Sequence, residues 1–110
     1  MIHCGGSYYG GSPQTTRARN IIDYMTIAST GNATDFGDLS TARDVRATIS
    51  NGVRSVMGGG QNAPADQGAV SATKENIMEY VTIASTGNTT DFGDLTVARS
   101  QNGGTSSSTR

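Results

Sequence analysis

Two pairs of acidic residues are the first candidates for chemistry in this 110-residue sequence. Asp35 and Asp38 lie in the segment DFGD, and Asp91 and Asp94 lie in a second copy of that segment. Paired carboxylates could bind calcium, because hard cations prefer several oxygen ligands. Two carboxylates make an incomplete site, however, and the sequence contains neither an EF-hand pattern nor a GGxGxD calcium-binding nonapeptide. We therefore expect Asp35 and Asp38 to bond turn amides and to pair with Arg43.

The adjacent residues His3 and Cys4 are a second candidate, for a metal site or a nucleophilic pair. Neighbouring residues of a strand point to opposite faces, so these two side chains would not converge on one ligand. Met57 and Gly58 occupy the same places in the second copy of the repeated pattern. We predict no catalytic residue, no metal site and no cofactor, and we expect His3 near the axis of an assembly or in an interface between repeats.

Two tyrosines, Tyr8 and Tyr9, are the candidates for ligand binding. They lie in the glycine-rich segment 5–11, which we expect to be a loop. An exposed tyrosine on a loop can stack on a sugar ring, because it offers both a flat face and a hydroxyl. Asn62 and Ala63 stand at about this place in the second repeat, so the framework does not require the pair. A glycan is the candidate ligand, and packing of at least one Tyr is the alternative.

A stretch of 24 residues that occurs twice must position these groups. Residues 76–99 repeat residues 20–43 at 18 of the 24 positions, with Asn76 standing 56 positions after Asn20. A long self-match at a fixed offset is the mark of a repeat architecture.

Each copy of the stretch reads as strand, turn, strand. Residues 21–27 are rich in β-branched and aromatic side chains, which favours a strand with apolar groups on both faces. A helix is the competing interpretation, but the Ser, Thr and Gly residues that follow are poor helix formers. Residues 29–32 have turn composition, and Phe36 and Leu39 fall in a shorter second strand in which Gly37 marks a bulge or a close approach.

The segment after Arg43 adds two more strands. Residues 46–50 are expected to pair with residues 53–57 through Asn51-Gly52, which is a strong hairpin signal. The polar segments 12–19 and 61–75, each with a proline, are expected to be loops. About four short strands in each unit, at a repeat offset of 56 residues, make a blade-sized antiparallel sheet.

The two repeat units span residues 1–54 and 55–110. Residues 1–6, MIHCGG, supply the counterpart of residues 55–60, SVMGGG, while residues 105–109 correspond to residues 49–53. A strand from the N-terminus is therefore expected to complete a sheet begun by the C-terminus of the same or a neighbouring copy.

Composition excludes several classes of function. The net charge is −1 with scattered charges, and 34% of the residues are apolar, with no Trp. No basic patch indicates nucleic acid, and no apolar run approaches the length that membrane insertion needs. The single Cys excludes an internal disulfide. No signal peptide is visible, which leaves a virion-associated or cytoplasmic location open.

These residues resemble the kelch repeat of β-propellers. The resemblance extends over nearly the whole chain and is most complete from Arg46 to Arg99: a first strand, then SVMGGG, then IMEYVTIA with Tyr80, then TDFGDLTVAR. The kelch pattern has a double glycine after its second strand, a Tyr in its third and a Trp opening its fourth. Phe36 and Phe92 stand where the family has Trp, and the 12-residue separation from Tyr to Phe is wider than the family's. The repeats are also similar to repeat arrays in predicted proteins of marine phages.

Residues that recur in both units are expected to form the framework of the blades rather than a site, since a catalytic site need occur only once. Recurrence of arginine suggests framework salt bridges. The expected framework residues are Gly5, Gly6, Gly59, Gly60, Tyr24, Tyr80, Phe36, Phe92, Asp38, Asp94, Arg43 and Arg99.

The resemblance implies a ring completed by homo-oligomerisation, because two blades cannot close a propeller of about four to eight blades. Three copies, giving six blades, are favoured by the blade number that is usual in the family, and four copies, giving eight blades, are the alternative. The expected function is non-enzymatic binding or display, with a phage virion or tail adhesion component that recognises glycans as one form of it. The alternatives are a purely structural propeller fragment, including one prepared to study how propellers arise from repeats, and a galactose-oxidase-like enzyme. The enzyme is disfavoured because its copper chemistry needs more His than the one present.

Overall fold

The chain is all-β in the parts that the structure describes. The structure is a computed structural model, and it describes residues 1–10, 15–45, 47–62, 72–101 and 103–107. All pairings between the described strands are antiparallel, and none of these residues lies in a helix. The expected all-β fold class with antiparallel sheets is therefore confirmed. No described segment is a helix long and apolar enough to cross a membrane.

A four-stranded sheet contains most of the second repeat, in the order β11-β10-β7-β6. Its strands are β6 (Ala47–Ser50), β7 (Arg54–Gly58), β10 (Ile77–Thr82) and β11 (Thr90–Asp94). The predicted hairpin at Asn51-Gly52 is present: Asn51 Oδ1 accepts hydrogen bonds from the amides of Val53 (3.0 Å) and Arg54 (2.9 Å). Gly52 supplies the positive φ of +89° that this turn requires.

A three-stranded sheet contains most of the first repeat, in the order β1-β4-β5. Its strands are β1 (Ile2–Cys4), β4 (Ile21–Tyr24) and β5 (Thr34–Asp38). His3 pairs with Asp23 as Met57 pairs with Glu79, so β1 takes the place of β7 in the same register, as predicted. β1 pairs with β4 alone among the described strands, which leaves its other edge open.

Both sheets contain the same bulge. In β5, Phe36 is the extra residue between two ladder partners, because Ile22 pairs with Gly37 while Asp23 pairs with Asp35. Phe92 is the extra residue at the equivalent place in β11. The glycine that follows each phenylalanine therefore marks a bulge, which is one of the two features that the sequence predicted at Gly37.

Two short hairpins correct the loops expected from the sequence. β2 (Ser7–Gly10) pairs with β3 (Thr15–Ala18), and β8 (Gln61–Asn62) pairs with β9 (Thr73–Lys74). Strand pairing uses only backbone donors and acceptors, so it does not need the apolar side chains that the prediction looked for. Pro13 and Pro64, which supported the loop prediction, lie outside the described residues.

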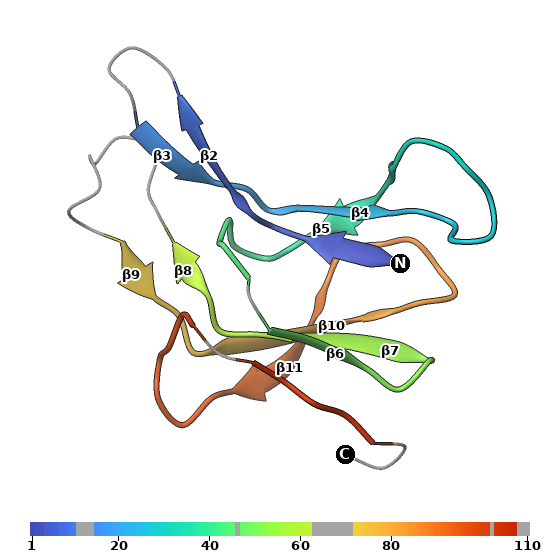
Figure 1. Ribbon diagram of the computed structural model, residues 1–110. Helices are drawn as coiled ribbons and strands as arrows, with labels where there is room; N and C mark the ends of the chain where they lie inside the picture. The colour runs from blue at the N-terminus through green and yellow to red at the C-terminus, as the bar shows by residue number, and fades with distance from the viewer. Residues whose placement is uncertain (11–14, 46, 63–71, 102, 108–110) are drawn as a thin grey trace.

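The two larger sheets pack on each other in two layers, and the two hairpins lie together at one end of the molecule (Figure 1). The core between the sheets comes from both repeats: the buried apolar residues that pack together in it are Cys4, Ile22, Phe36, Leu39, Met57 and Val81. This small core matches the low apolar content of the chain.

Candidate functional site

The expected tyrosine platform lies on a strand rather than in a loop. Tyr8 is in β2, and its side chain is 49% exposed. The guanidinium carbon of Arg19 lies 5.7 Å from the centroid of the Tyr8 ring, within the range of a cation–π contact. That contact occupies one face of the ring. Tyr9 pairs through its backbone with Thr16, and its side chain lies outside the described part of the chain.

His3 and Cys4 do not form a joint site. Cys4 is buried in the core, whereas His3 is exposed. Burial raises the pKa of the Cys4 thiol from 9.0 to about 11, and the positive charge of Arg43 opposes that rise. Within the described ranges, no three His, Cys, Asp or Glu side chains come close enough to hold a metal ion.

The acidic pairs differ from expectation in their partner. The carboxylate that pairs with Arg43 is Glu79 of the other sheet, at 2.8 Å, and not Asp35 or Asp38. The sequence prediction was wrong because it paired charges within one hairpin, whereas Arg43 crosses to the neighbouring sheet. The turn-amide bond expected of such carboxylates occurs in the second repeat, where Asp91 Oδ1 accepts the amide of Gly93 at 3.1 Å.

A buried polar junction joins the two sheets. Arg43 is fully buried, and its Nε donates to the carbonyl of Gly59 at 3.1 Å while its Nη2 forms the ion pair with Glu79. Glu79 Oε1 also accepts the amide of Ser40 at 3.2 Å. Nη1 of Arg43 is buried and has no hydrogen-bond partner among the described residues. Arg43 therefore fixes how the sheets sit on each other, with one donor unsatisfied.

The hairpin loop of the second repeat adds backbone bonds across the same junction. Gly87 donates its amide to the carbonyl of Phe36 at 2.7 Å, and Thr89 donates to the carbonyl of Asp38 at 2.9 Å. Asn88 Oδ1 accepts the amide of Asp38 at 3.1 Å. A Cβ at Gly37 would collide with the carbonyl oxygen of Gly87, so only glycine permits this approach.

The aromatic framework pairs are alike in geometry and unlike in exposure. Tyr24 meets Phe36 edge-to-face at 5.9 Å and 81°, and Tyr80 meets Phe92 at 6.1 Å and 76°. Phe36 is 4% exposed, however, whereas Phe92 is 51% exposed. The environment of the two sheets, and not their internal structure, makes this difference.

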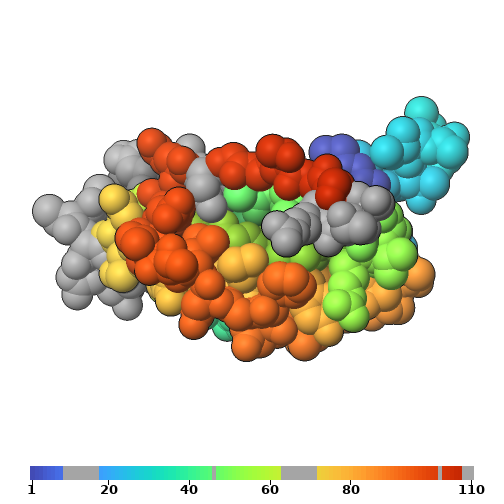
Figure 2. Space-filling view, turned by 90° about the horizontal axis from the view of Figure 1, so that it is seen from below, coloured from blue at the N-terminus to red at the C-terminus, as the bar shows by residue number. Residues whose placement is uncertain are grey.

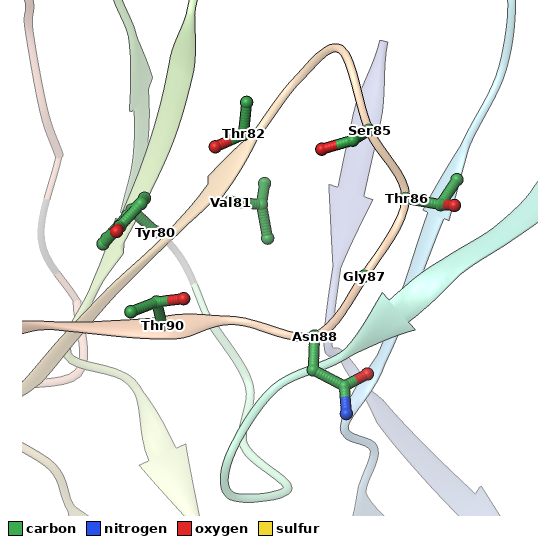
Figure 3. A pocket seen from close by; sticks show the side chains of 8 residues that line it. All are labelled: Tyr80, Val81, Thr82, Ser85, Thr86, Gly87, Asn88 and Thr90. Atoms are coloured by element: carbon green, nitrogen blue, oxygen red, sulfur yellow. The ribbon is translucent and has the colours of Figure 1, made fainter.

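A polar pocket of about 240 Å³ lies inside the hairpin loop that joins β10 and β11, and we call it the loop pocket. Figure 3 shows Val81 at its centre, with the side chains of Thr82, Ser85 and Thr90 around it. Its lining residues are Tyr80, Val81, Thr82, Ser85, Thr86, Gly87, Asn88 and Thr90. They offer hydroxyl and amide groups and no charge. Such a lining suits a neutral, polyhydroxylated ligand better than an ion.

The first repeat has a loop pocket at the equivalent place, with a volume of about 110 Å³. Its lining residues are Tyr24, Met25, Thr26, Ser29, Gly31, Asn32 and Thr34, and each is the counterpart of a residue that lines the second pocket. Sequence reasoning missed both pockets because it assigned repeated residues to the scaffold. The sequence signal that could have predicted them is the segment STGN, which occurs at residues 29–32 and 85–88 and combines a turn with several hydrogen-bonding side chains.

Comparisons of the chain with protein-family models, with curated proteins and with solved structures found no match.

Proposed function

We propose that the chain is a non-enzymatic, kelch-like β-propeller module that assembles with copies of itself into a closed ring and binds neutral glycans. In this proposal each repeat is one blade. Three copies then give six blades, and four copies give eight, both within the usual range of about four to eight. The observation that carries the binding role is the loop pocket, which recurs in both repeats with the same polar lining.

The chemistry of the loop pocket favours a sugar over a charged or apolar ligand. Thr82, Ser85, Thr90 and the side chain of Asn88 provide both donors and acceptors, while Tyr80 adds an aromatic ring, one face of which the guanidinium of Arg54 occupies at 4.6 Å. An open pocket of this kind buries little of a ligand, so a single site is expected to bind weakly, with a Kd of about 1 mM or above. A ring presents several pockets at once, which raises its effective affinity for a multivalent glycan.

A purely structural role is the second candidate, and one observation favours it. Gly87 and Asn88, which line the loop pocket, also bond to β5 of the neighbouring sheet. The repeated loop then serves to join blades, and its pocket is a consequence of the turn. A virion or tail adhesion component fits the binding role, and a display scaffold without ligand fits the structural one.

A glycan array probed with the 110-residue chain separates the two candidates. Binding to neutral glycans that falls at least about fivefold when both loop pockets are altered, in a Thr26→Val, Ser29→Ala, Thr82→Val, Ser85→Ala variant, would support the loop pockets, since each lost hydrogen bond costs about 1 kcal/mol. Tyr8→Ala is the matched comparison, because it tests the alternative platform on β2. Binding lost only with Tyr8→Ala would move the site to that hairpin, and no binding by folded chain would leave the structural role.

A further inference from the structure

Equivalent residues of the two repeats lie in opposite environments. The face of the first sheet that meets the second contains buried Ile22, Phe36, Leu39 and Arg43. Their counterparts on the second sheet are Met78, Phe92, Leu95 and Arg99, and all four are more exposed than the buried set. Figure 2 shows this side of the molecule from outside, with the residues of β10 and β11 in orange at the surface.

The opposite face of the first sheet is exposed, whereas the equivalent face of the second sheet is buried. In the second sheet, Met57, Glu79 and Val81 receive the first sheet and are buried. The same places in the first sheet hold His3, Asp23 and Met25; His3 and Met25 are exposed and Asp23 is half-buried. Each sheet therefore has one face that is buried in the junction and one exposed face. That exposed face is equivalent to the face that the other sheet buries in the junction.

We infer that a second copy of the chain docks head to tail on these two faces and repeats the junction that already joins the sheets. This inference rests on the proposed ring. Arg99 of one copy then takes the place of Arg43, with its guanidinium between the carboxylate of Asp23 and the carbonyl of Gly5 in the next copy. Asp23 replaces Glu79, and Gly5 replaces Gly59, whose φ of +65° it matches at +61°.

Arg99 is available for that role. It is exposed, and its Nε donates to the carbonyl of Val97 only two residues away, at 3.3 Å. Its backbone is already held as that of Arg43 is: the Arg99 amide donates to Glu75 at 3.2 Å, and the Arg43 amide donates to Arg19 at 3.3 Å. Docking therefore needs a change of side-chain rotamer and no change in the backbone at Arg99.

The space beside Gly93 agrees with this docked position. Both Gly93 and its counterpart Gly37 have a positive φ, but a Cβ at Gly37 would meet the loop of the other sheet, whereas a Cβ at Gly93 would meet nothing within 4 Å. The docked copy supplies the missing neighbour. Its loop residues Gly31 and Asn32 are identical to Gly87 and Asn88, and they would bond to β11 as those residues bond to β5.

Head-to-tail docking also places residues 103–106 of one copy beside the open edge of β1 in the next copy. These residues stand 56 positions after β6, which pairs with β7, and β1 takes the place of β7 in its sheet. By that register Thr105 would face Ile2, as Ile49 faces Val56. In the single chain Ser106 instead donates its hydroxyl to the carbonyl of Ser50 at 2.8 Å, so this segment exchanges β6 for β1 on docking.

Charge reversal at the proposed contact tests the inference. The mass of the chain is measured by sedimentation velocity and native mass spectrometry over a range of concentrations, for wild type, Arg99→Glu, Asp23→Arg and the double variant. We expect each single reversal to raise the protein concentration at which half of the assembly has dissociated. The increase should be about thirtyfold or more, because breaking a desolvated charge pair costs about 2 kcal/mol or more. The double variant should regain most of the loss. Lys74→Glu, which makes the same charge change on exposed β9, should leave the mass unchanged.

The outcomes separate this inference from the proposed function. If the wild type assembles and both single reversals assemble at the same concentrations as the wild type, the Arg99 interface is wrong, while the proposed ring stands. Folded wild type that stays at the mass of one chain would overturn the ring itself. Phe92→Gln covers the case in which a reversal prevents folding, since Phe92 is 51% exposed and its replacement should weaken assembly without unfolding the chain. Assembly by that variant at wild-type concentrations would contradict the docked face.

Discussion

Replacing Arg43 by methionine should destabilise the chain by about 3–5 kcal/mol, because it leaves Glu79 as an uncompensated buried charge. The side chains of the two residues are 0% and 3% exposed, and after the change Glu79 keeps, among the described residues, only the amide of Ser40 as a donor. A loss of this size is a large fraction of the stability of a small domain, and it should lower the melting temperature by more than about 10 °C.

The double variant Arg43→Met, Glu79→Met should recover most of that loss. An apolar pair avoids the desolvation of both ions, and Nη1 of Arg43 has no partner among the described residues, so the native junction contains an unmet cost. Chemical denaturation of the wild type, both single variants and the double variant forms a thermodynamic cycle. Arg54→Met is the control: Arg54 is exposed and lies 4.6 Å from the Tyr80 ring, so its loss should cost no more than about 1 kcal/mol. Additive losses in the double variant would refute the coupling of Arg43 to Glu79.

Two further predictions concern the glycines and the cysteine. Gly37→Ala should destabilise the monomeric chain more than Gly93→Ala does. Both glycines have a positive φ, but only Gly37 faces the carbonyl of Gly87. Equal melting temperatures of the two variants would contradict this prediction. Stability should fall as the pH rises from about 9 to about 11, because the unfolded chain releases the Cys4 proton near 9 while the folded chain holds it to about 11. Denaturation curves at several pH values measure this, and Cys4→Ala should remove the component that Cys4 contributes.

Local features of the fold were predictable because local residues determine them. Asn51-Gly52 specified a hairpin through its own backbone preferences, and Gly37 indicated a bulge or a close approach, both of which are present. The register of β1 also followed from the sequence, since the repeat supplied β7 as a template for it. In each case the information lay within a few residues or in the second copy.

What sequence reasoning missed depends on partners outside the local segment. Nothing near Arg43 identifies Glu79 as its partner, since that contact exists only after the sheets pack. The hairpins β2–β3 and β8–β9 lack the apolar alternation by which strands are recognised, although their backbones pair like any others. The opposite exposure of Phe36 and Phe92 cannot be found from identical sequences at all, because it arises from which neighbour each sheet has.

The open edge of β1 bears on how the single chain behaves in solution. Natural sheets protect exposed edges with charges, prolines or bulges, whereas Ile2, His3 and Cys4 offer no such protection beyond the shortness of the strand. An unpaired edge accepts any extended segment, including one from a misfolded chain, and such mispairing is a route to aggregation. Unassembled chain should therefore be the form that aggregates on storage, and more so as its concentration rises. Closure of the proposed ring would then protect the protein against pairing at this edge.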